Sequence, residues 1–193
     1  MKNSIKETFS QFLIEVSGIS DSAINDYYAC WETVEFKNKQ VITAPGQTER
    51  YLYFILTGVH KSYYLHTREH IIAFAYPPSF SGVIDSFLTQ SESKYYLESI
   101  GDSTALRISY NDHSRILEMH RDLDTFFRKL TENYLRGIIQ RLYEVMALPI
   151  EERFTLFVKR SPHLLQMVPQ KDLAAYLRID PTNFSKLINR IKI

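Results

Sequence analysis

The chain has 193 residues with 23 Lys and Arg against 22 Asp and Glu, and 45% of its residues are hydrophobic. Its 13 Tyr and 12 Phe exclude an intrinsically disordered chain, and its length allows one domain or two small ones. The single cysteine, Cys30, excludes an intramolecular disulfide and any site built from several thiolates. No apolar core follows the charged N-terminus, so no signal peptide is indicated. The longest uncharged apolar stretch, residues 71–84, is broken by Pro77-Pro78 and is too short for a membrane helix, so we expect a cytoplasmic protein with no membrane partner.

The charge is divided unevenly along the chain. Residues 1–150 hold 15 basic and 18 acidic residues, a net charge of −3, whereas residues 151–193 hold 8 basic and 4 acidic residues, a net charge of +4. A basic segment of this kind is typical of a surface that meets a polyanion.

The first thirty residues predict short helices. Apolar side chains recur every three or four residues, at Phe9, Phe12, Leu13, Val16, Ile24, Tyr27 and Tyr28. The segment Ser20-Asp21-Ser22 stands where the N-cap of the second helix is expected.

From about Glu32 to Tyr110 the apolar period shortens toward two, and β-branched and aromatic residues become frequent. We predict seven strands, at residues 33–36, 40–43, 51–57, 59–66, 70–76, 96–100 and 103–109. Turn residues separate them at Pro45-Gly46, Gly58, Thr67-Arg68, Pro77-Pro78 and Gly101-Asp102. Short strands at this spacing predict an antiparallel sandwich, roll or jelly roll.

A helical pattern returns after Asp112. From residue 122 to residue 148, apolar residues form one continuous stripe: Leu123, Phe127, Leu130, Tyr134, Ile138, Leu142 and Val145. A helix of this length exceeds what one side of a small β-domain can cover, so we predict that part of the stripe packs against a second copy of the chain. The alternative is an ordinary long helix that lies on its own sheet.

The C-terminal end predicts a helix–turn–helix. Residues 168–177 form its first helix and Arg178-Ile179 its tight turn, and Asp180 and Pro181 suit the N-cap and first position of the second helix. The spacing predicts a buried face on that helix at Phe184, Leu187, Ile188 and Ile191. The outer face and its flanks then carry short polar and basic side chains, at Thr182, Asn183, Ser185, Lys186, Asn189 and Arg190.

Hydroxyl, amide and ammonium groups are those that bind base edges and phosphates in the major groove of DNA. We therefore predict that this face binds double-stranded DNA, with Lys186 reading a base. Arg190 and Lys192, nearer the chain end, are expected to contact phosphates or to be solvated. Pro149 breaks the preceding helix and marks the start of this region. The predicted division is 1–121 for the helices and β-roll, 122–148 for the dimerisation helix and 149–193 for the helix–turn–helix.

Three segments carry a resemblance to a known family. They are Ala44-Pro-Gly-Gln47, Tyr51-Leu-Tyr-Phe-Ile-Leu-Thr-Gly58, and Gln170-Lys-Asp-Leu-Ala-Ala-Tyr-Leu177 followed by Phe184-Ser-Lys-Leu-Ile188. Together with the order of the elements, they make the chain resemble the cyclic AMP receptor protein/FNR family of bacterial transcription regulators over nearly its whole length. The resemblance implies an α+β fold with a β-roll effector domain and a winged-helix-like domain, here without residues for the wing. It also implies a homodimer that is not an enzyme, a near-palindromic DNA site and RNA polymerase as a further partner.

The same resemblance places an effector pocket at Ser81, Gly82, Val83, Ser93 and Lys94, with Tyr134 and Ile138 of the long helix. Binders of cyclic nucleotides in this family hold the ribose with a Gly-Glu pair and the cyclic phosphate with an Arg-Ser pair. This chain has Val83 in place of the Glu and Ser93-Lys94 in place of the Arg-Ser pair. We therefore expect no cyclic AMP binding, and the sequence identifies no cofactor and leaves the effector and the operator open.

Other functions stand as alternatives. His60, His66 and His70 cluster around one predicted hairpin, but they lack the His-x-His spacing of a cupin metal site. No acid–base pair or nucleophile triad indicates an enzyme, and Cys30 lies in an apolar segment where an inert thiol is usual. The main alternative is a dimeric ligand-binding or protein-interaction module of the same fold that binds no operator. A steep salt dependence of DNA affinity would separate the two.

Overall fold

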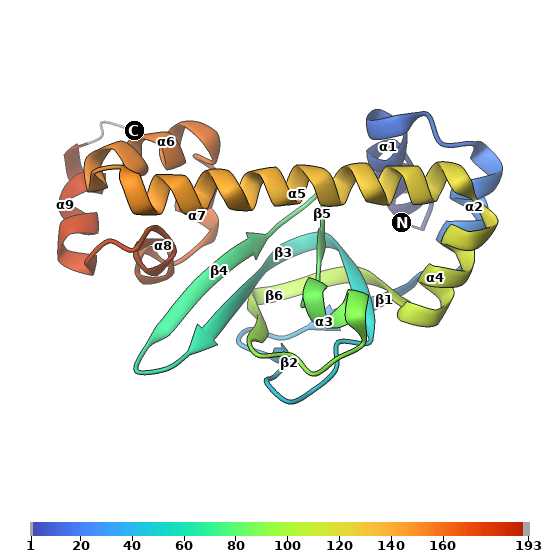
Figure 1. Ribbon diagram of the computed structural model, residues 1–193, viewed down its shortest axis with the longest axis horizontal. Coiled ribbons are helices and arrows are strands. Elements are labelled where there is room, and N and C mark those ends of the chain that lie inside the picture. The colour runs from blue at the N-terminus through green and yellow to red at the C-terminus, as the bar shows by residue number, and fades with distance from the viewer. Residues whose placement is uncertain (1, 191–193) are drawn as a thin grey trace.

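The computed structural model describes the chain from residue 2 to residue 190. Ile191 and Lys192, which the sequence assigns to the last helix and to a phosphate contact, lie outside the described residues. A group of N-terminal helices precedes a β-sheet, a long helix crosses the molecule, and short helices gather at its far end (Figure 1). None of the helices within residues 2–190 is long and apolar enough to cross a membrane.

The N-terminal helices are α1 (Lys2–Ser17) and α2 (Asp21–Ala29). Ser20 caps α2, as predicted, and its hydroxyl accepts a hydrogen bond from the backbone N–H of Ala23 at 3.4 Å. The N–H and the hydroxyl of Ser20 both donate to Asp122 in the long helix, at 2.8 Å. The cap therefore also fastens the N-terminal helices to the long helix.

The sheet consists of β1 (Glu32–Phe36), β2 (Val41–Thr43), β3 (Tyr51–Leu65), β4 (Glu69–Ala75), β5 (Ser79–Ser81) and β6 (Tyr96–Ser109). All pairings are antiparallel, with the order β1-β6-β3-β4, while β2 pairs with β6 and β5 pairs with β3. The predicted jelly-roll-like antiparallel fold is confirmed, as an open sheet. A short helix, α3 (Ile84–Thr89), follows β5, and the sequence predicted neither of these two elements.

The prediction of seven separate strands is wrong because two of the assumed turns lie inside continuous strands. Residues 51–57 and 59–66 belong to β3, and residues 96–100 and 103–109 belong to β6. At Gly58 the register between these strands shifts, and φ is +83°. A Cβ atom there would lie 2.5 Å from the Cβ of Ser103, so the close approach of the two strands requires glycine.

Alternate residues of β3 face two different cores. Leu52 and Phe54 pack with α1, α2 and the long helix, whereas Tyr53 and Ile55 face the inside of the roll. This alternation follows from the two-residue period of a strand. Burying one such side chain contributes about 1.5–3 kcal/mol, so both faces of β3 hold the roll together.

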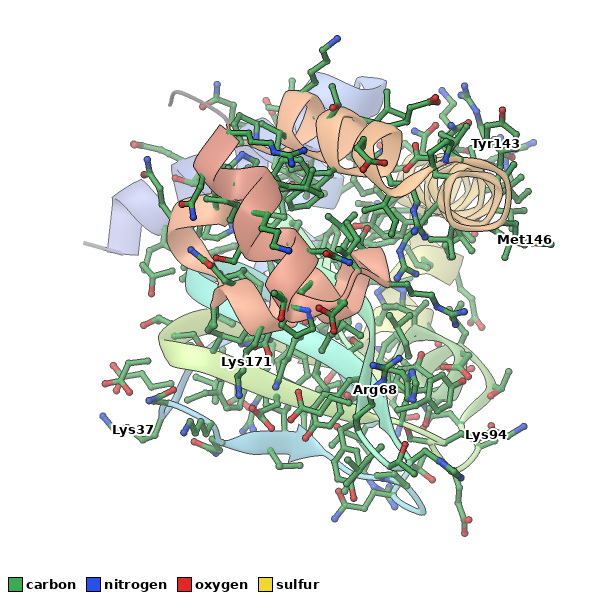
Figure 2. All side chains as sticks on the ribbon, turned by 90° about the vertical axis from the view of Figure 1, so that its left-hand side faces the viewer. Lys37, Arg68, Lys94, Tyr143, Met146 and Lys171 are labelled. Carbon is green, nitrogen blue, oxygen red and sulfur yellow. The ribbon has the colours of Figure 1, made fainter. Side chains whose placement is uncertain are left out.

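Helix α4 (Tyr110–Met119) leads into the long helix α5 (Arg121–Ala147), which agrees with the predicted range to within one residue at each end. The first part of α5 is buried, with Leu123 and Phe126 inaccessible to solvent. The second part leaves an apolar face in solvent, hereafter the uncovered face, made of Leu135, Ile138, Ile139, Leu142, Tyr143 and Met146. Figure 2 shows Tyr143 and Met146 projecting outward from the helix.

Four further helices follow, α6 (Ile150–Arg160), α7 (Leu164–Met167), α8 (Gln170–Leu177) and α9 (Pro181–Arg190). Their core also takes in Val59 of β3, and Phe74 of β4 packs against it. Arg178 ends α8 in the left-handed conformation, at φ +53°. Asp180 then caps α9, because its carboxylate accepts from the N–H of Thr182 at 2.9 Å. The predicted pair of helices with a tight turn is therefore present.

Candidate nucleic-acid interface and effector pocket

Helix α9 presents its polar side to solvent. The six residues predicted to contact DNA are all exposed, namely Thr182, Asn183, Ser185, Lys186, Asn189 and Arg190. Phe184 and Leu187 are buried on the opposite side, and the Phe184 ring meets Phe154 of α6 edge to face at 5.4 Å. Burial of that side fixes which residues of α9 face outward.

The position and charge of α9 suit a polyanion. Helix α9 lies at the end of the molecule toward which the C-terminus of α5 points (Figure 1). Its sequence contains Lys186 and Arg190 and no acidic residue. The nearest carboxylate in sequence, that of Asp180, is engaged by the backbone N–H groups of Thr182 and Asn183 at 2.9 and 3.4 Å. The exposed side of the helix is therefore cationic and rich in hydrogen-bonding groups.

Five of the seven predicted effector residues lie in the segment 79–95, hereafter the cassette, which contains β5 and α3. Ser81 is buried, and its hydroxyl lies 3.1 Å from Nδ1 of His60. Nε2 of His60 lies 3.0 Å from the hydroxyl of Ser103. Burial lowers the pKa of His60 to about 4, so its ring is neutral at pH 7 and is bonded on both sides.

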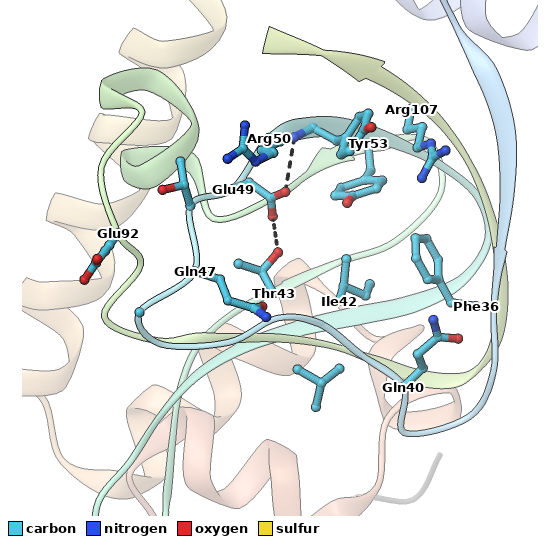
Figure 3. Close-up of a pocket in the computed structure, with 14 residues that line it drawn as sticks. Phe36, Gln40, Ile42, Thr43, Gln47, Glu49, Arg50, Tyr53, Glu92 and Arg107 are labelled. Atoms are coloured by element: carbon cyan, nitrogen blue, oxygen red, sulfur yellow. Dashed lines mark hydrogen bonds between the residues drawn. The ribbon is translucent and has the colours of Figure 1, made fainter.

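The backbone N–H of Val83 is directed at a carboxylate of the chain itself. It donates to Oε2 of Glu49 at 3.4 Å, and the hydroxyl of Thr43 donates to the same oxygen at 2.7 Å. The N–H of Tyr51 donates to Oε1 at 3.2 Å, so several bonds converge on Glu49 (Figure 3). Burial raises the pKa of Glu49, although these hydrogen bonds favour its charged form.

The remaining predicted effector residues do not form one pocket. The hydroxyl of Ser93 donates to the carbonyl of Tyr95 at 2.6 Å, and Lys94 is exposed. Tyr134 borders a small apolar pocket with Phe80 and α3, so it does lie beside the cassette. Ile138 is 64% exposed and belongs to the uncovered face. The structure therefore brings Ser81, Gly82 and Val83 together, and leaves Ile138 apart from them.

A second hollow lies next to the cassette, and the sequence did not indicate it. Its volume is about 580 Å³, and Gln40, Gln47, Tyr53 and Arg107 are among the residues that line it (Figure 3). Glu49 separates this hollow from Val83. No sequence pattern marked it, because its lining comes from β1, β2, β3 and β6 and the loops between them.

The residues of the alternative sites are His60, His66, His70 and Cys30. Within residues 2–190, no group of three or more His, Cys, Asp or Glu side chains could hold a metal ion. Both ring nitrogens of His60 are hydrogen-bonded to serines, whereas His66 and His70 lie at the far end of the β3–β4 hairpin. The Cys30 thiol donates to the carbonyl of Asp26 and accepts a bond from Arg115 at 3.4 Å.

Residues 33–120 match the family described as cyclic nucleotide-binding domain. The search of curated proteins finds no match. Among solved structures, FixK2 from Bradyrhizobium japonicum is similar with a TM-score of 0.73 and 16% identity, over 83% of each chain. The catabolite activator protein of Thermus thermophilus has a TM-score of 0.57 and 17% identity, over 92% of this chain and 84% of that one.

The c-di-GMP-responsive regulator CLP of Xanthomonas campestris is also similar, with a TM-score of 0.64 and 14% identity, over 89% of this chain and 91% of that one. At these identities the likeness shows the fold. The chain therefore has the fold of the cyclic AMP receptor protein/FNR regulators, and the resemblance seen in the sequence is confirmed at the level of the fold.

Proposed function

We propose that the chain is a homodimeric transcription regulator that binds double-stranded DNA through the outer face of α9. The observation that carries the proposal is the division of α9 into a buried apolar side and an exposed side with two cations and no acid. Short polar side chains with Lys and Arg on a helix that protrudes from a domain suit the major groove.

The uncovered face of α5 supports the dimer. Its members follow one another at steps of three and one, as along one side of a helix, and Met146 is 77% exposed. Because an apolar patch of this extent is unfavourable in water, we expect a second copy of α5 to cover it. If the two-fold axis runs parallel to α5, the two α5 helices are parallel and both copies of α9 lie at the same end of the dimer.

Two α9 helices at one end predict the form of the DNA site. A symmetric dimer reads two half-sites about one helical turn, roughly 34 Å, apart. The binding site should therefore be a near-palindrome. The family resemblance aligns Val83 with the glutamate, and Ser93-Lys94 with the Arg-Ser pair, that binders of cyclic AMP use. We therefore expect any effector of this regulator to be bound through other groups.

Selection of preferred duplexes from a random pool, followed by titration over a range of salt concentrations, tests the proposal. We expect a near-palindromic consensus and an affinity that falls steeply with salt, because phosphate contacts release counterions. Sedimentation at micromolar concentration should show a dimer. No enrichment of any sequence, together with a flat salt dependence, would favour the protein-interaction module instead.

A further inference from the structure

A buried ion cluster joins the roll to the C-terminal helices, away from the cassette and from the outer face of α9. At its centre is Lys61 of β3, whose side chain is 4% exposed. Its Nζ lies 2.6 Å from Glu69 and 3.4 Å from Glu98, both in the sheet. It also lies 3.8 Å from Oδ2 of Asp172, in the first turn of α8. One lysine therefore links two parts of the fold.

The charges of this cluster depend on one another. Burial by itself would lower the pKa of Lys61, but the surrounding carboxylates outweigh it and raise that pKa. Burial raises the pKa of Asp172, and Lys61 offsets this only in part. A buried carboxylate is unfavourable without a cation beside it, so the nearby ammonium of Lys61 stabilises the charged form of Asp172. The cluster thus favours contact between α8 and the sheet.

Arg141 of α5 makes a second link to the same helix. One terminal nitrogen of its guanidinium donates to the carbonyl of Ile71 in β4 at 3.0 Å and to that of Tyr176 in α8 at 2.9 Å. The guanidinium also lies over the Tyr176 ring, 4.2 Å from its centre. Phe74 of β4 packs on the same ring at 5.3 Å. Three elements therefore meet at Tyr176.

We propose that Lys61 and Arg141 are positioning residues for DNA binding, which hold α8 against the β3–β4 hairpin and so fix the direction in which α9 faces. The inference rests on the proposed function. Helix α9 follows α8 after a short turn and packs against it, so a tilt of α8 carries α9 with it. The links are made by the chain's own side chains.

Distances between spin labels test the links without DNA. Labels on Lys37→Cys in the roll and Lys159→Cys in α6, in a Cys30→Ala background, report how the C-terminal helices sit on the roll. Mixing labelled chains with a large excess of unlabelled chains confines the signal to one protomer. We expect a narrow distance distribution for the parent protein, and a broad one for Asp172→Asn combined with Arg141→Gln.

Glu69→Gln is the matched control, because it removes a partner of the same lysine within the roll and leaves the link to α8. It should lower stability while the distances stay narrow, and Lys61→Arg should keep them narrow too. The double variant should bind its preferred duplex about tenfold more weakly, because fewer molecules hold α9 in the competent direction. Its salt slope should be unchanged, since no phosphate contact is lost.

Two outcomes would overturn the proposal. Narrow distances in a folded double variant would show that these links do not position α8. Broad distances with undiminished affinity for the selected duplex would show that the position of α8 does not govern DNA binding. If the parent protein selects no DNA and the distances still broaden, the proposed function fails, and with it the positioning role, while the fastening of α8 stands.

Discussion

The cassette and the outer face of α9 carry similar polar groups and use them in opposite ways. In the cassette, the hydroxyls of Ser81 and Ser93 and the N–H of Val83 are each bonded to another part of the chain. On α9, Thr182 and Lys186 stand exposed to solvent. A paired group offers little to a ligand because binding must first break a bond, whereas an exposed group exchanges water for the ligand. The difference favours the C-terminal end over the cassette as the place for polar recognition.

Splitting the dimer, and so separating the two copies of α9, should have the largest effect on DNA affinity. Ile138→Asp places a charge in the uncovered face, and burying it unpaired would prevent the two α5 helices from packing. We expect a monomer by sedimentation and an affinity for the palindromic site reduced about a hundredfold or more, because one α9 loses the benefit of its partner. Asn133→Asp, an exposed position of α5 outside the uncovered face, is the control and should stay dimeric. A dimeric Ile138→Asp variant would contradict the dimer surface.

The burial of His60, beside the cassette, predicts sensitivity to acid. His60 has a pKa of about 4 when folded, against 6.5 for an ordinary histidine, so the unfolded chain takes up the proton first. The shift of His60 should therefore lower the free energy of unfolding by about 3 kcal/mol as the pH drops from 6.5 to 4. Buried His113, whose pKa is also lowered to about 4, adds to the fall over the same range. Urea unfolding over this range measures it. In His60→Gln the fall should be smaller by that amount, and an equal fall would show that the burial of His60 does not contribute to it.

Loss of Lys186 should reduce the sequence preference at one base position in each half-site. Lys186 is exposed near the middle of α9, one turn beyond Thr182, where its ammonium can reach O6 or N7 of guanine. Lys186→Ala should weaken binding to the preferred duplex by about 1–3 kcal/mol and relax the preference at that position. Lys171→Ala, which removes a lysine from the first turn of α8, should not alter the sequence preference. Equal losses of Lys186→Ala on preferred and scrambled duplexes would make Lys186 a phosphate contact.

Local signals in the sequence predicted the C-terminal end well. The cap and the helix start at Asp180-Pro181 and the spacing of Phe184 and Leu187 are properties of neighbouring residues, and they fixed which side of α9 is buried. The range of α5 followed from periodicity for the same reason. Gly58 was misinterpreted as a turn because a glycine that allows two strands to approach closely looks the same in sequence as one that ends a strand.

The features that sequence reasoning missed depend on residues far apart in the chain. Glu49 meets Val83 across 34 positions, and no pattern around either residue indicates the other. Lys61 and Asp172 lie in the sheet and in α8, and each looks like an ordinary surface charge in the sequence. Such pairs follow from how the elements pack, so they become visible only in the fold.

A smaller and unspecific loss is expected from Arg190. It lies in the last turn of α9, exposed and far from the centre of the outer face. Arg190→Ala should weaken binding to preferred and scrambled duplexes alike and reduce the salt slope by about one per half-site, since one phosphate contact is lost. A loss confined to the preferred duplex would assign Arg190 to base reading instead.

Cyclic AMP should have no effect, and this expected absence tests the cassette directly. A ligand at a hundred times its dissociation constant stabilises the folded chain by about 2.7 kcal/mol, which a thermal shift reveals as several degrees. Here Val83 offers no carboxylate to the ribose, and the hydroxyl of Ser93 is bonded to Tyr95. Lys94 alone remains for the phosphate, and an exposed lysine attracts AMP as well as its cyclic form. A rise in melting temperature with cyclic AMP but not with AMP would therefore mean that the ligand replaces the internal hydrogen bonds of the cassette. The contrast drawn between the cassette and the outer face of α9 would then be wrong.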